Sequence, residues 1–273
     1  MELEEISYIE RGNGQNCLFL IHGFCSGPED WIHQINFFSQ YFTVLAPTLR
    51  GHDGNNVNNR PMSIEQLSND CINIIENRKF KKIILAGHSM GTRVAIDMAS
   101  KIKNLNGLIL VDGSRFSNFE NYFDELSAFE KSLKNSDYES ILRKMFSSMF
   151  FSPKFENDKK RIVDRAINVP MDYSITLRRN TIWYDSHCVE NYVKNLNTPI
   201  LLLHSTKIDK ENGRITINNN DDVPYIDFIK FWTDQITINK FEKTGHYITI
   251  EEPDIVNEQI IEWLEKLKLH FRQ

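Results

Sequence analysis

The stretch Lys82-Ile83-Ile84-Leu85-Ala86-Gly87-His88-Ser89-Met90-Gly91-Thr92 decides the fold. It begins as an apolar run of the length of a buried strand and ends in the pattern G-x-S-x-G, and a helical pattern follows at once over residues 93–103. A strand, a sharp turn and a helix form the context in which the central serine of this pattern becomes a nucleophile. The glycines on either side remove Cβ atoms that would clash in the strained turn. We therefore predict a reactive serine, Ser89, at the end of a buried strand.

Apolar strands alternate with amphipathic helices on both sides of this stretch. Further buried strands are predicted at Cys17–Ile21, Thr43–Ala46, Gly107–Asp112 and Pro199–His204, and an alternating strand at Gln235–Phe241. Helices are predicted at Glu29–Tyr41, after the cap residue Ser63, at Pro224–Asp234 and after Pro253. Continuously apolar strands that alternate with helices are typical of a mostly parallel sheet with helices on both faces. The fold class is therefore α/β.

The N-terminal segment predicts a smaller feature of the sheet. Residues Leu3–Glu10 partly alternate, and the turn residues Gly12-Asn13-Gly14 follow them. Alternation that ends in a glycine turn before an apolar run favours a hairpin. We expect this hairpin to lead into the strand Cys17–Ile21.

The alternation of strands and helices stops between residues 115 and 195. This segment carries several amphipathic patterns of helical spacing, such as Phe123, Leu126 and Phe129. We predict that residues 115–195 form a helical lid inserted into a core made of residues 1–114 and 196–273. The adjacent residues Arg178 and Arg179 in this segment could bind a carboxylate, but we expect both to be surface charges.

Composition excludes several classes of protein. The chain has 273 residues and a net charge of −5, so it lacks the excess of basic residues that is typical of nucleic-acid-binding proteins. It contains no apolar run near the roughly 20 residues of a membrane helix, and its acidic start lacks the pattern of a signal peptide. Its four cysteines are scattered without disulfide or metal-ligand spacing. We expect a cytoplasmic protein without a membrane partner.

Together these features resemble the α/β-hydrolase fold family, and in particular its lid-bearing, esterase-like serine hydrolases. The resemblance covers nearly the whole chain. Its motifs stand in the family's order, and they are His22-Gly23, Arg50-Gly51-His52, Gly87–Gly91, Pro199–Leu203 and Gly245-His246 followed by Glu251-Glu252-Pro253. The order serine, acid, histidine along the chain is also that of the family.

A serine nucleophile needs a base and an acid that orients the base. His246, after the last strand, is the expected base, whereas His22 is expected to shape the oxyanion loop. The family usually places the acid after the strand Ile200–His204, which favours Asp209. Some relatives place it one strand earlier, which gives Asp112.

Two further acids stay open at this point. Asp221 and Asp222 lie closer in sequence to His246, but they precede a predicted helix and could cap it. The order of preference is Asp209, then Asp112, then this pair. His52, His88 and His204 are weaker candidates for the base and are expected to be structural.

The resemblance also implies two donors for a developing oxyanion. The backbone N–H groups of Phe24 and Met90 are expected to supply them, with Cys25 or Ser26 replacing Phe24 if the loop is shifted. The thiol of Cys25 is expected to form a small part of the pocket wall rather than to react.

These residues predict a serine hydrolase that cleaves a small to medium, apolar acyl ester through an acyl-enzyme. The expected partner is a small-molecule substrate, with no cofactor and no metal ion, in a monomer or homodimer. An epoxide hydrolase of this fold would carry aspartate in place of Ser89. Two alternatives remain, hydrolysis of a carbon–carbon bond in a β-diketone by the same residues and a non-catalytic ligand receptor.

Overall fold

The computed structural model describes residues 6–52, 62–103, 105–209 and 213–269. Within them, seven strands form one sheet in the order β1-β3-β2-β4-β5-β6-β9. All neighbours from β3 to β9 are parallel, which confirms the predicted sheet. The strands are β1 (Tyr8–Arg11), β2 (Asn16–Ile21), β3 (Thr43–Pro47), β4 (Lys82–His88), β5 (Leu105–Val111), β6 (Ile200–His204) and β9 (Ile236–Lys240).

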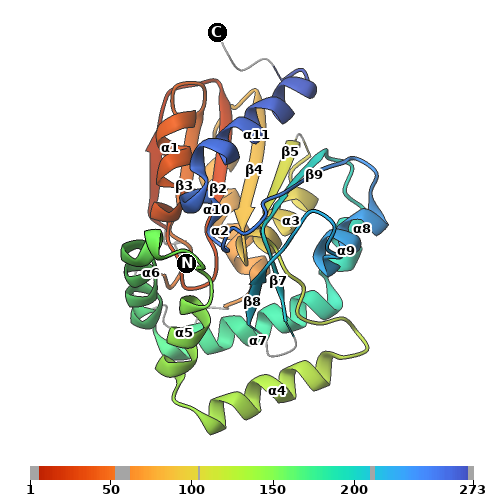
Figure 1. Cartoon of the computed structure of the whole chain (residues 1–273). Coiled ribbons are helices and arrows are strands. Elements are labelled where there is room, and N and C mark those ends of the chain that lie inside the picture. Colours follow the sequence, from red (N-terminus) through yellow and green to blue (C-terminus); the bar gives the residue numbers. More distant parts are fainter. Residues whose placement is uncertain (1–5, 53–61, 104, 210–212, 270–273) are drawn as a thin grey trace.

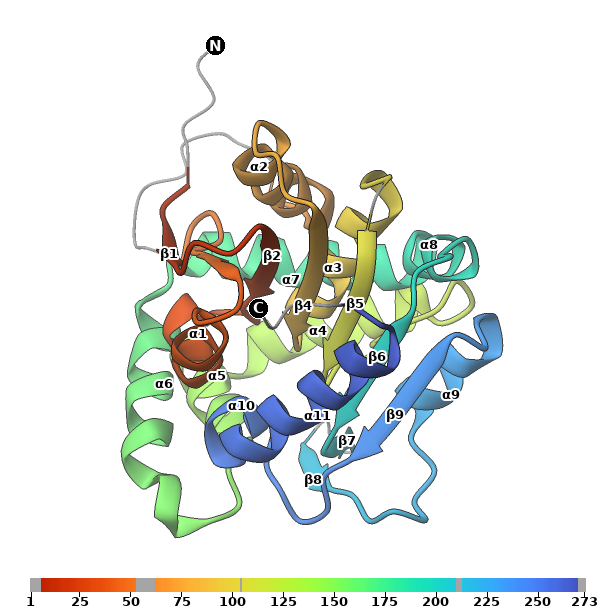
Figure 2. The ribbon, with the colours of Figure 1, turned by 90° about the horizontal axis from the view of Figure 1, so that it is seen from above.

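The apolar strands supply two cores, one on each face of the sheet, because successive side chains of a strand point to opposite faces. On β2, Phe19 and Ile21 belong to one core, and Leu18 and Leu20 belong to the other. Figure 2 shows α2 and α3 on one face and α1 and α11 on the other. The helices of the two faces are α1 (Ile32–Phe38), preceded by the 3-10 helix η1 (Pro28–Trp31), α2 (Ile64–Glu76), α3 (Gly91–Lys101), α9 (Pro224–Trp232), α10 (Ile248–Glu251) and α11 (Pro253–Lys266).

The first described strand does not form the predicted hairpin. β1 pairs antiparallel with β3, with Tyr8 opposite Pro47, rather than with β2. The reason is that β3 occupies the edge of β2, where Cys17 lies opposite Thr43, so that only the outer edge of β3 remains for β1. The turn after β1 therefore crosses over β3, and at Gly12 a Cβ atom would meet the carbonyl oxygen of Phe42 at 2.1 Å.

Between β5 and β6, where every residue is described, the chain forms a helical insertion. Its helices are α4 (Tyr122–Asn135), α5 (Tyr138–Ser147), the 3-10 helix η2 (Pro153–Phe155), α6 (Glu156–Asn168), α7 (Met171–His187) and α8 (Val189–Lys194). In Figure 1, α4, α5 and α7 lie below the sheet, whereas α8 packs beside α3 and α9. The predicted lid segment thus consists of helices joined by loops, of which residues 115–121 and 148–152 are the longest, and its last helix packs beside α3 and α9.

The segment after β6 is more structured than its polar sequence suggested. Instead of a loop, β7 (Thr206–Ile208) and β8 (Arg214–Thr216) form an antiparallel pair. Thr206 and Arg214 are buried, and the pair brings both side chains back to the carboxyl end of β5.

Candidate active site

The turn after β4 is the predicted strained elbow. Ser89 has a φ angle of +55°, which a residue other than glycine rarely adopts, and its backbone N–H donates to the carbonyl of Val111 over 2.9 Å. A Cβ atom at Gly87 would lie 2.2 Å from the carbonyl oxygen of Gly91, and one at Gly91 would lie 2.5 Å from that of Ile21. Both glycines are therefore required for the turn that holds Ser89 at the N-terminus of α3.

His246 and Asp112 form a hydrogen-bonded pair beside this elbow. His246 lies in the loop between β9 and α10, and its Nδ1 atom is 2.6 Å from Oδ2 of Asp112. Its backbone N–H donates to the carbonyl of Met149 over 2.9 Å, so the insertion helps to hold the loop. Ser89 and His246 line the same pocket. The geometry thus brings serine, histidine and aspartate together from three segments distant in sequence.

Asp112 is a buried carboxylate that several hydrogen-bond donors hold in place. It is fully buried, with a φ angle of +42°, and Oδ1 accepts from the backbone N–H groups of Ser205 and Thr206 at 2.8 and 2.9 Å. Oδ2 accepts from Arg214 at 3.1 Å as well as from His246. Burial alone would raise the pKa of Asp112, but neighbouring histidines and Arg214 hold this pKa well below its usual range.

Asp209 was the acid preferred from the sequence, but in the structure Asp112 is the carboxylate that bonds His246. Asp209 follows β7, where its carboxylate accepts from the backbone N–H of Gly213 over 2.8 Å. The β7–β8 pair carries this residue away from the histidine, whereas β5 ends next to it. Asp221 pairs with Lys207 at 3.4 Å and closes a turn at Asn218.

The neutral form of His246 is favoured in the folded protein. Its pKa lies well below 6.5 because of burial and the positive charge of Arg214, with a further contribution from His88, and Asp112 only partly opposes them. Since the ionised Asp112 accepts a hydrogen bond, the proton of the neutral ring resides on Nδ1. Nε2 therefore carries a lone pair that can accept a proton.

The loop after β2 has the geometry expected of an oxyanion loop. Phe24 and Met90 line the pocket, and within the described residues no protein group accepts the backbone N–H of either. The N–H of Cys25, in contrast, donates to Nε2 of His52 over 3.1 Å, which leaves Phe24 as the available donor of the pair. His22 accepts from the N–H of Leu49 and bonds the carbonyl of its neighbour, as expected for a residue that shapes the loop.

The weaker candidates His88, His204 and Cys25 make contacts that support the fold rather than the reaction. Nε2 of His88 donates to the carbonyl of His246 over 2.9 Å, and His204 lies with Nδ1 3.6 Å from Asp112. Cys25 is fully buried and is not part of the pocket wall that the sequence predicted for it. Burial raises the pKa of its thiol, which therefore stays protonated and unreactive.

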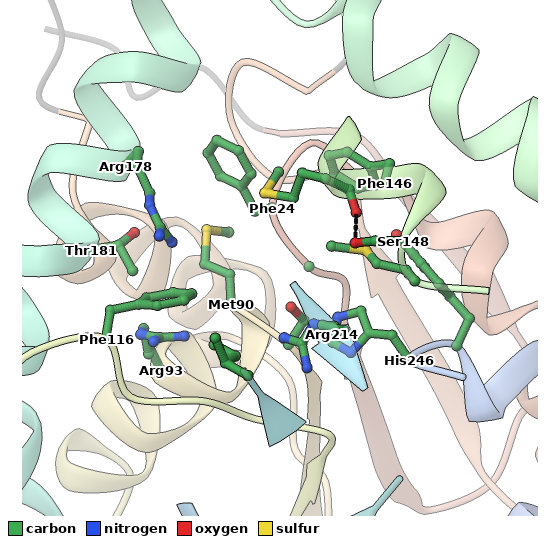
Figure 3. A pocket seen from close by; sticks show the side chains of 16 residues that line it. Phe24, Met90, Arg93, Phe116, Phe146, Ser148, Arg178, Thr181, Arg214 and His246 are labelled. Carbon is green, nitrogen blue, oxygen red and sulfur yellow. Dashed lines mark hydrogen bonds between the residues drawn. The ribbon is translucent and has the colours of Figure 1, made fainter. Parts of the chain in front are cut away.

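The pocket at Ser89 encloses about 750 Å³, including the part open to solvent. Figure 3 shows His246 and Ser148 on one side, Arg178, Phe116 and Arg93 on the other, and Met90 between them. Its lining residues are Gly23, Phe24, Ser89, Met90, Arg93, Phe116, Met145, Phe146, Ser148, Met149, Arg178, Thr181, Ile208, Arg214, His246 and Tyr247. Most of the wall is apolar, but three guanidinium groups interrupt it.

Arg93 and Arg214 were not predicted as parts of the site, and Arg178, although named as a possible carboxylate ligand, was expected at the surface. Arg179 behaves as expected, since it pairs with Glu130 at the surface over 2.6 Å. Its neighbour Arg178 lies instead in the pocket. Arg93 follows the elbow by one turn of α3, and Arg214 comes from the β8 strand that appeared to be a loop. For Arg93, the signal in the sequence was its position four residues after Ser89, at the start of the helix that follows the elbow.

Two kinds of feature are absent from the described residues. In the part of the chain that the structure describes, no three His, Cys, Asp or Glu side chains lie together as metal ligands would. Among the same residues, no helix combines the length and apolar character needed to cross a membrane.

Comparison with known proteins gives the family. The model of the alpha/beta hydrolase family matches residues 18–259. Epoxide hydrolase 1 of Caenorhabditis elegans is 23% identical over 96% of this chain and 68% of its own length. The (E)-2-((N-methylformamido)methylene)succinate hydrolase of Acinetobacter baylyi is 29% identical, but the match spans only 37% of this chain and 41% of that protein.

Solved structures have the same fold. The thermophilic esterase from Thermogutta terrifontis, with malate bound, superposes with a TM-score of 0.76 at 21% identity, over 96% of this chain and 93% of the esterase. At this identity the likeness concerns the fold alone. The family model, which covers most of the chain, carries the assignment: the protein is a member of the alpha/beta hydrolase family.

Proposed function

We propose that the protein is a serine hydrolase that cleaves a carboxylic ester through an acyl-enzyme intermediate. The observation that supports this most directly is the hydrogen bond between His246 and Asp112 beside the strained Ser89. Asp112 fixes the proton of the histidine on Nδ1, so that Nε2 can take the proton of the serine hydroxyl. An aspartate nucleophile, as in the epoxide hydrolases of this fold, is not available at this elbow.

In the proposed reaction Ser89 Oγ attacks the ester carbon while His246 takes its proton. The backbone N–H groups of Phe24 and Met90 stabilise the oxyanion. The histidinium then protonates the leaving alcohol, and the resulting acyl-enzyme is hydrolysed by a water molecule that His246 deprotonates. The helical insertion acts as a lid that keeps bulk water from the pocket.

A fluorophosphonate probe tests the nucleophile. Wild type is expected to become labelled, and Ser89→Ala is expected to lose the label and the hydrolysis of p-nitrophenyl esters. Ser148→Ala is the matched control, because Ser148 lines the same pocket but its hydroxyl donates to the carbonyl of Met145. Equal labelling of wild type and Ser89→Ala would exclude the serine mechanism and favour a non-catalytic receptor.

The bond that is cleaved needs a separate test, since the same three residues also suit carbon–carbon hydrolysis of a β-diketone. The apolar wall around Phe24 and Phe146 supports an ester with a small or medium acyl chain. A p-nitrophenyl ester series and a β-diketone, compared by kcat/KM, separate the two reactions. Higher kcat/KM on the diketone would replace the ester proposal.

The cellular compartment and the oligomeric state of the enzyme are also proposals. Cys17, Cys25, Cys71 and Cys188 are all unpaired. Free thiols fit the reducing cytoplasm, where we place the enzyme, as a monomer or homodimer.

A further inference from the structure

Arg178 is a cation in the wall of the pocket that contains Ser89. It comes from the middle of α7, in the helical insertion, and its side chain is only partly exposed. Figure 3 shows its guanidinium pointing down toward Phe116 and Arg93, on the side of the pocket away from His246. A ligand that reaches Ser89 therefore shares one cavity with this charge.

Asp185 and Glu125 act on Arg178 at longer range, but no carboxylate of the described residues forms an ion pair with it. Its guanidinium instead lies over the face of Phe116, 3.6 Å from the ring centroid. The adjacent Arg179 differs sharply, since both its Nε and Nη2 atoms donate to Glu130. Of these two neighbours on α7, Arg179 is thus a paired charge at the surface and Arg178 an unpaired charge in the pocket.

Asp185, whose charge acts on Arg178, is already bound by another arginine. Asp185 binds Nε and Nη2 of Arg93 with both oxygens, each at 2.6 Å, and also accepts the backbone N–H of Phe116 at 2.7 Å. The third pocket arginine, Arg214, is likewise paired, with Asp112 at 3.1 Å. Among the three guanidinium groups of the pocket, Arg178 alone has no carboxylate partner in the described chain.

Burying an unpaired cation is unfavourable, because its hydration is lost without a compensating charge. Burial and the nearby charge of Arg93 lower the pKa of Arg178 to about 10. An anion in the pocket would remove this unfavourable energy, and the planar fork of a guanidinium matches the two oxygens of a carboxylate.

We propose that the substrate carries a free carboxylate, which Arg178 binds at the wall of the pocket away from His246. This rests on the proposed function, in that the ester group occupies the pocket at Ser89. Figure 3 shows Met90 between Arg178 and His246, and Phe24 and Met90 are among the residues that line the pocket. The substrate is therefore an ester whose cleavable group and carboxylate are joined by a short apolar chain.

A matched pair of substrates tests the charge. One is the p-nitrophenyl half-ester of adipic acid, which keeps a free carboxylate, and the other is the same ester with that carboxylate capped as a methyl ester. Wild type is expected to show a kcat/KM at least tenfold higher for the half-ester. In Arg178→Gln this ratio is expected to fall roughly 10- to 100-fold, mainly through KM, as expected for the loss of a charge-assisted hydrogen bond.

Two further variants define the role of the guanidinium. Arg179→Gln removes the same charge from the same helix outside the pocket and is expected to keep the wild-type ratio. Arg178→Lys keeps the charge but loses the fork, and it is expected to recover only part of the preference. A wild-type ratio near one, or the same ratio in Arg178→Gln as in wild type, would overturn the proposal.

A binding measurement separates this inference from the proposed reaction. In the Ser89→Ala background, calorimetry compares the binding of the half-ester and the capped ester. At least tenfold tighter binding of the half-ester, lost in Ser89→Ala/Arg178→Gln, supports the carboxylate site even if wild type hydrolyses neither ester. Equal affinities for the two esters would refute the site even if wild type is an active esterase.

Discussion

The Nδ1 atom of His246 lies 2.6 Å from Oδ2 of Asp112, and this contact joins the end of β5 to the loop after β9 across the carboxyl edge of the sheet. Asp112 is itself fixed by two backbone N–H donors, from Ser205 and Thr206. A carboxylate held in this way does not have to reorganise when the neighbouring imidazole gains a proton. The pair therefore fixes both the position and the tautomer of the histidine.

Asp112→Asn is expected to lower kcat by roughly 10³- to 10⁴-fold, because an amide no longer fixes the proton on Nδ1 of His246. Asp209→Asn is the matched control and is expected to stay within about threefold of wild type, since its carboxylate bonds Gly213 at the surface hairpin. Steady-state kinetics on one p-nitrophenyl ester, with circular dichroism to verify folding, measures both. A larger loss at Asp209 would mean that the pairing of Asp112 with His246 is not used in catalysis.

The pH profile should report the lowered pKa of His246. A base must be neutral, so activity is lost only as pH falls through this pKa, which lies well below 6.5. We expect kcat/KM to be flat from pH 8 to about 6.5 and to decline only at lower pH. A profile whose midpoint lies above pH 7 would contradict the effects of burial and positive charge at this site.

Arg214 should control where that decline begins. Its positive charge, next to Asp112, disfavours the protonated form of His246. Arg214→Gln is therefore expected to raise the pKa of the histidine and move the acidic limb of kcat/KM to higher pH. Lys207→Gln, on the neighbouring strand but outside the pocket at Ser89, is the control and should leave the limb in place. An acidic limb that stayed in place in both variants would show that Arg214 only supports the fold.

Most of the fold follows from local patterns. The strands around Ser89 are continuously apolar because they are buried on both faces, and this property is visible without any tertiary information. The cap of α2 was also predictable, since the hydroxyl of Ser63 accepts from the N–H of Gln66 over 3.2 Å. The pairing of β1 with β3 was not predictable, because the choice between β2 and β3 as a partner depends on which edge is free.

The site could be predicted only in part, because the positions of some of its residues also depend on the tertiary fold. Ser89 and His246 stand in recognisable motifs, whereas the choice between Asp112 and Asp209 depends on the path of a hairpin that contains few apolar residues. The different positions of Arg178 and Arg179 likewise depend on which side of α7 faces the pocket. A helix whose polar residues are spread around its circumference does not reveal that side.

Two arginines of the pocket should affect stability in opposite ways. Arg93 is buried and pairs with Asp185, so Arg93→Met leaves a buried carboxylate without its partner and is expected to lower the free energy of unfolding by about 3–5 kcal/mol. Arg178→Met removes an unpaired cation and is expected to leave stability equal or higher. Urea unfolding followed by circular dichroism compares them. Marked destabilisation by Arg178→Met would indicate a structural role for that residue.

Glu251 predicts a pH dependence of stability that is independent of catalysis. Its buried carboxylate accepts from the N–H of Gly245, next to His246, while Oε1 has no partner in the described chain. Burial raises the pKa of Glu251 to about 7. Between the unfolded value near 4.5 and pH 7, the unfolded state releases this proton first, so the contribution of Glu251 to stability decreases as pH rises.

Glu251→Gln should remove that decrease, because a glutamine can accept the same hydrogen bond without ionising. We expect the variant to be more stable than wild type at pH 8 and nearly equal to it at pH 5, as measured by the urea midpoint. Glu258→Gln, on the exposed face of α11, controls for the general loss of one negative charge and should show no such difference between the two pH values. If Glu251→Gln destabilised the protein equally at both pH values, its carboxylate would be ionised throughout, and the loop that holds His246 would depend on that charge.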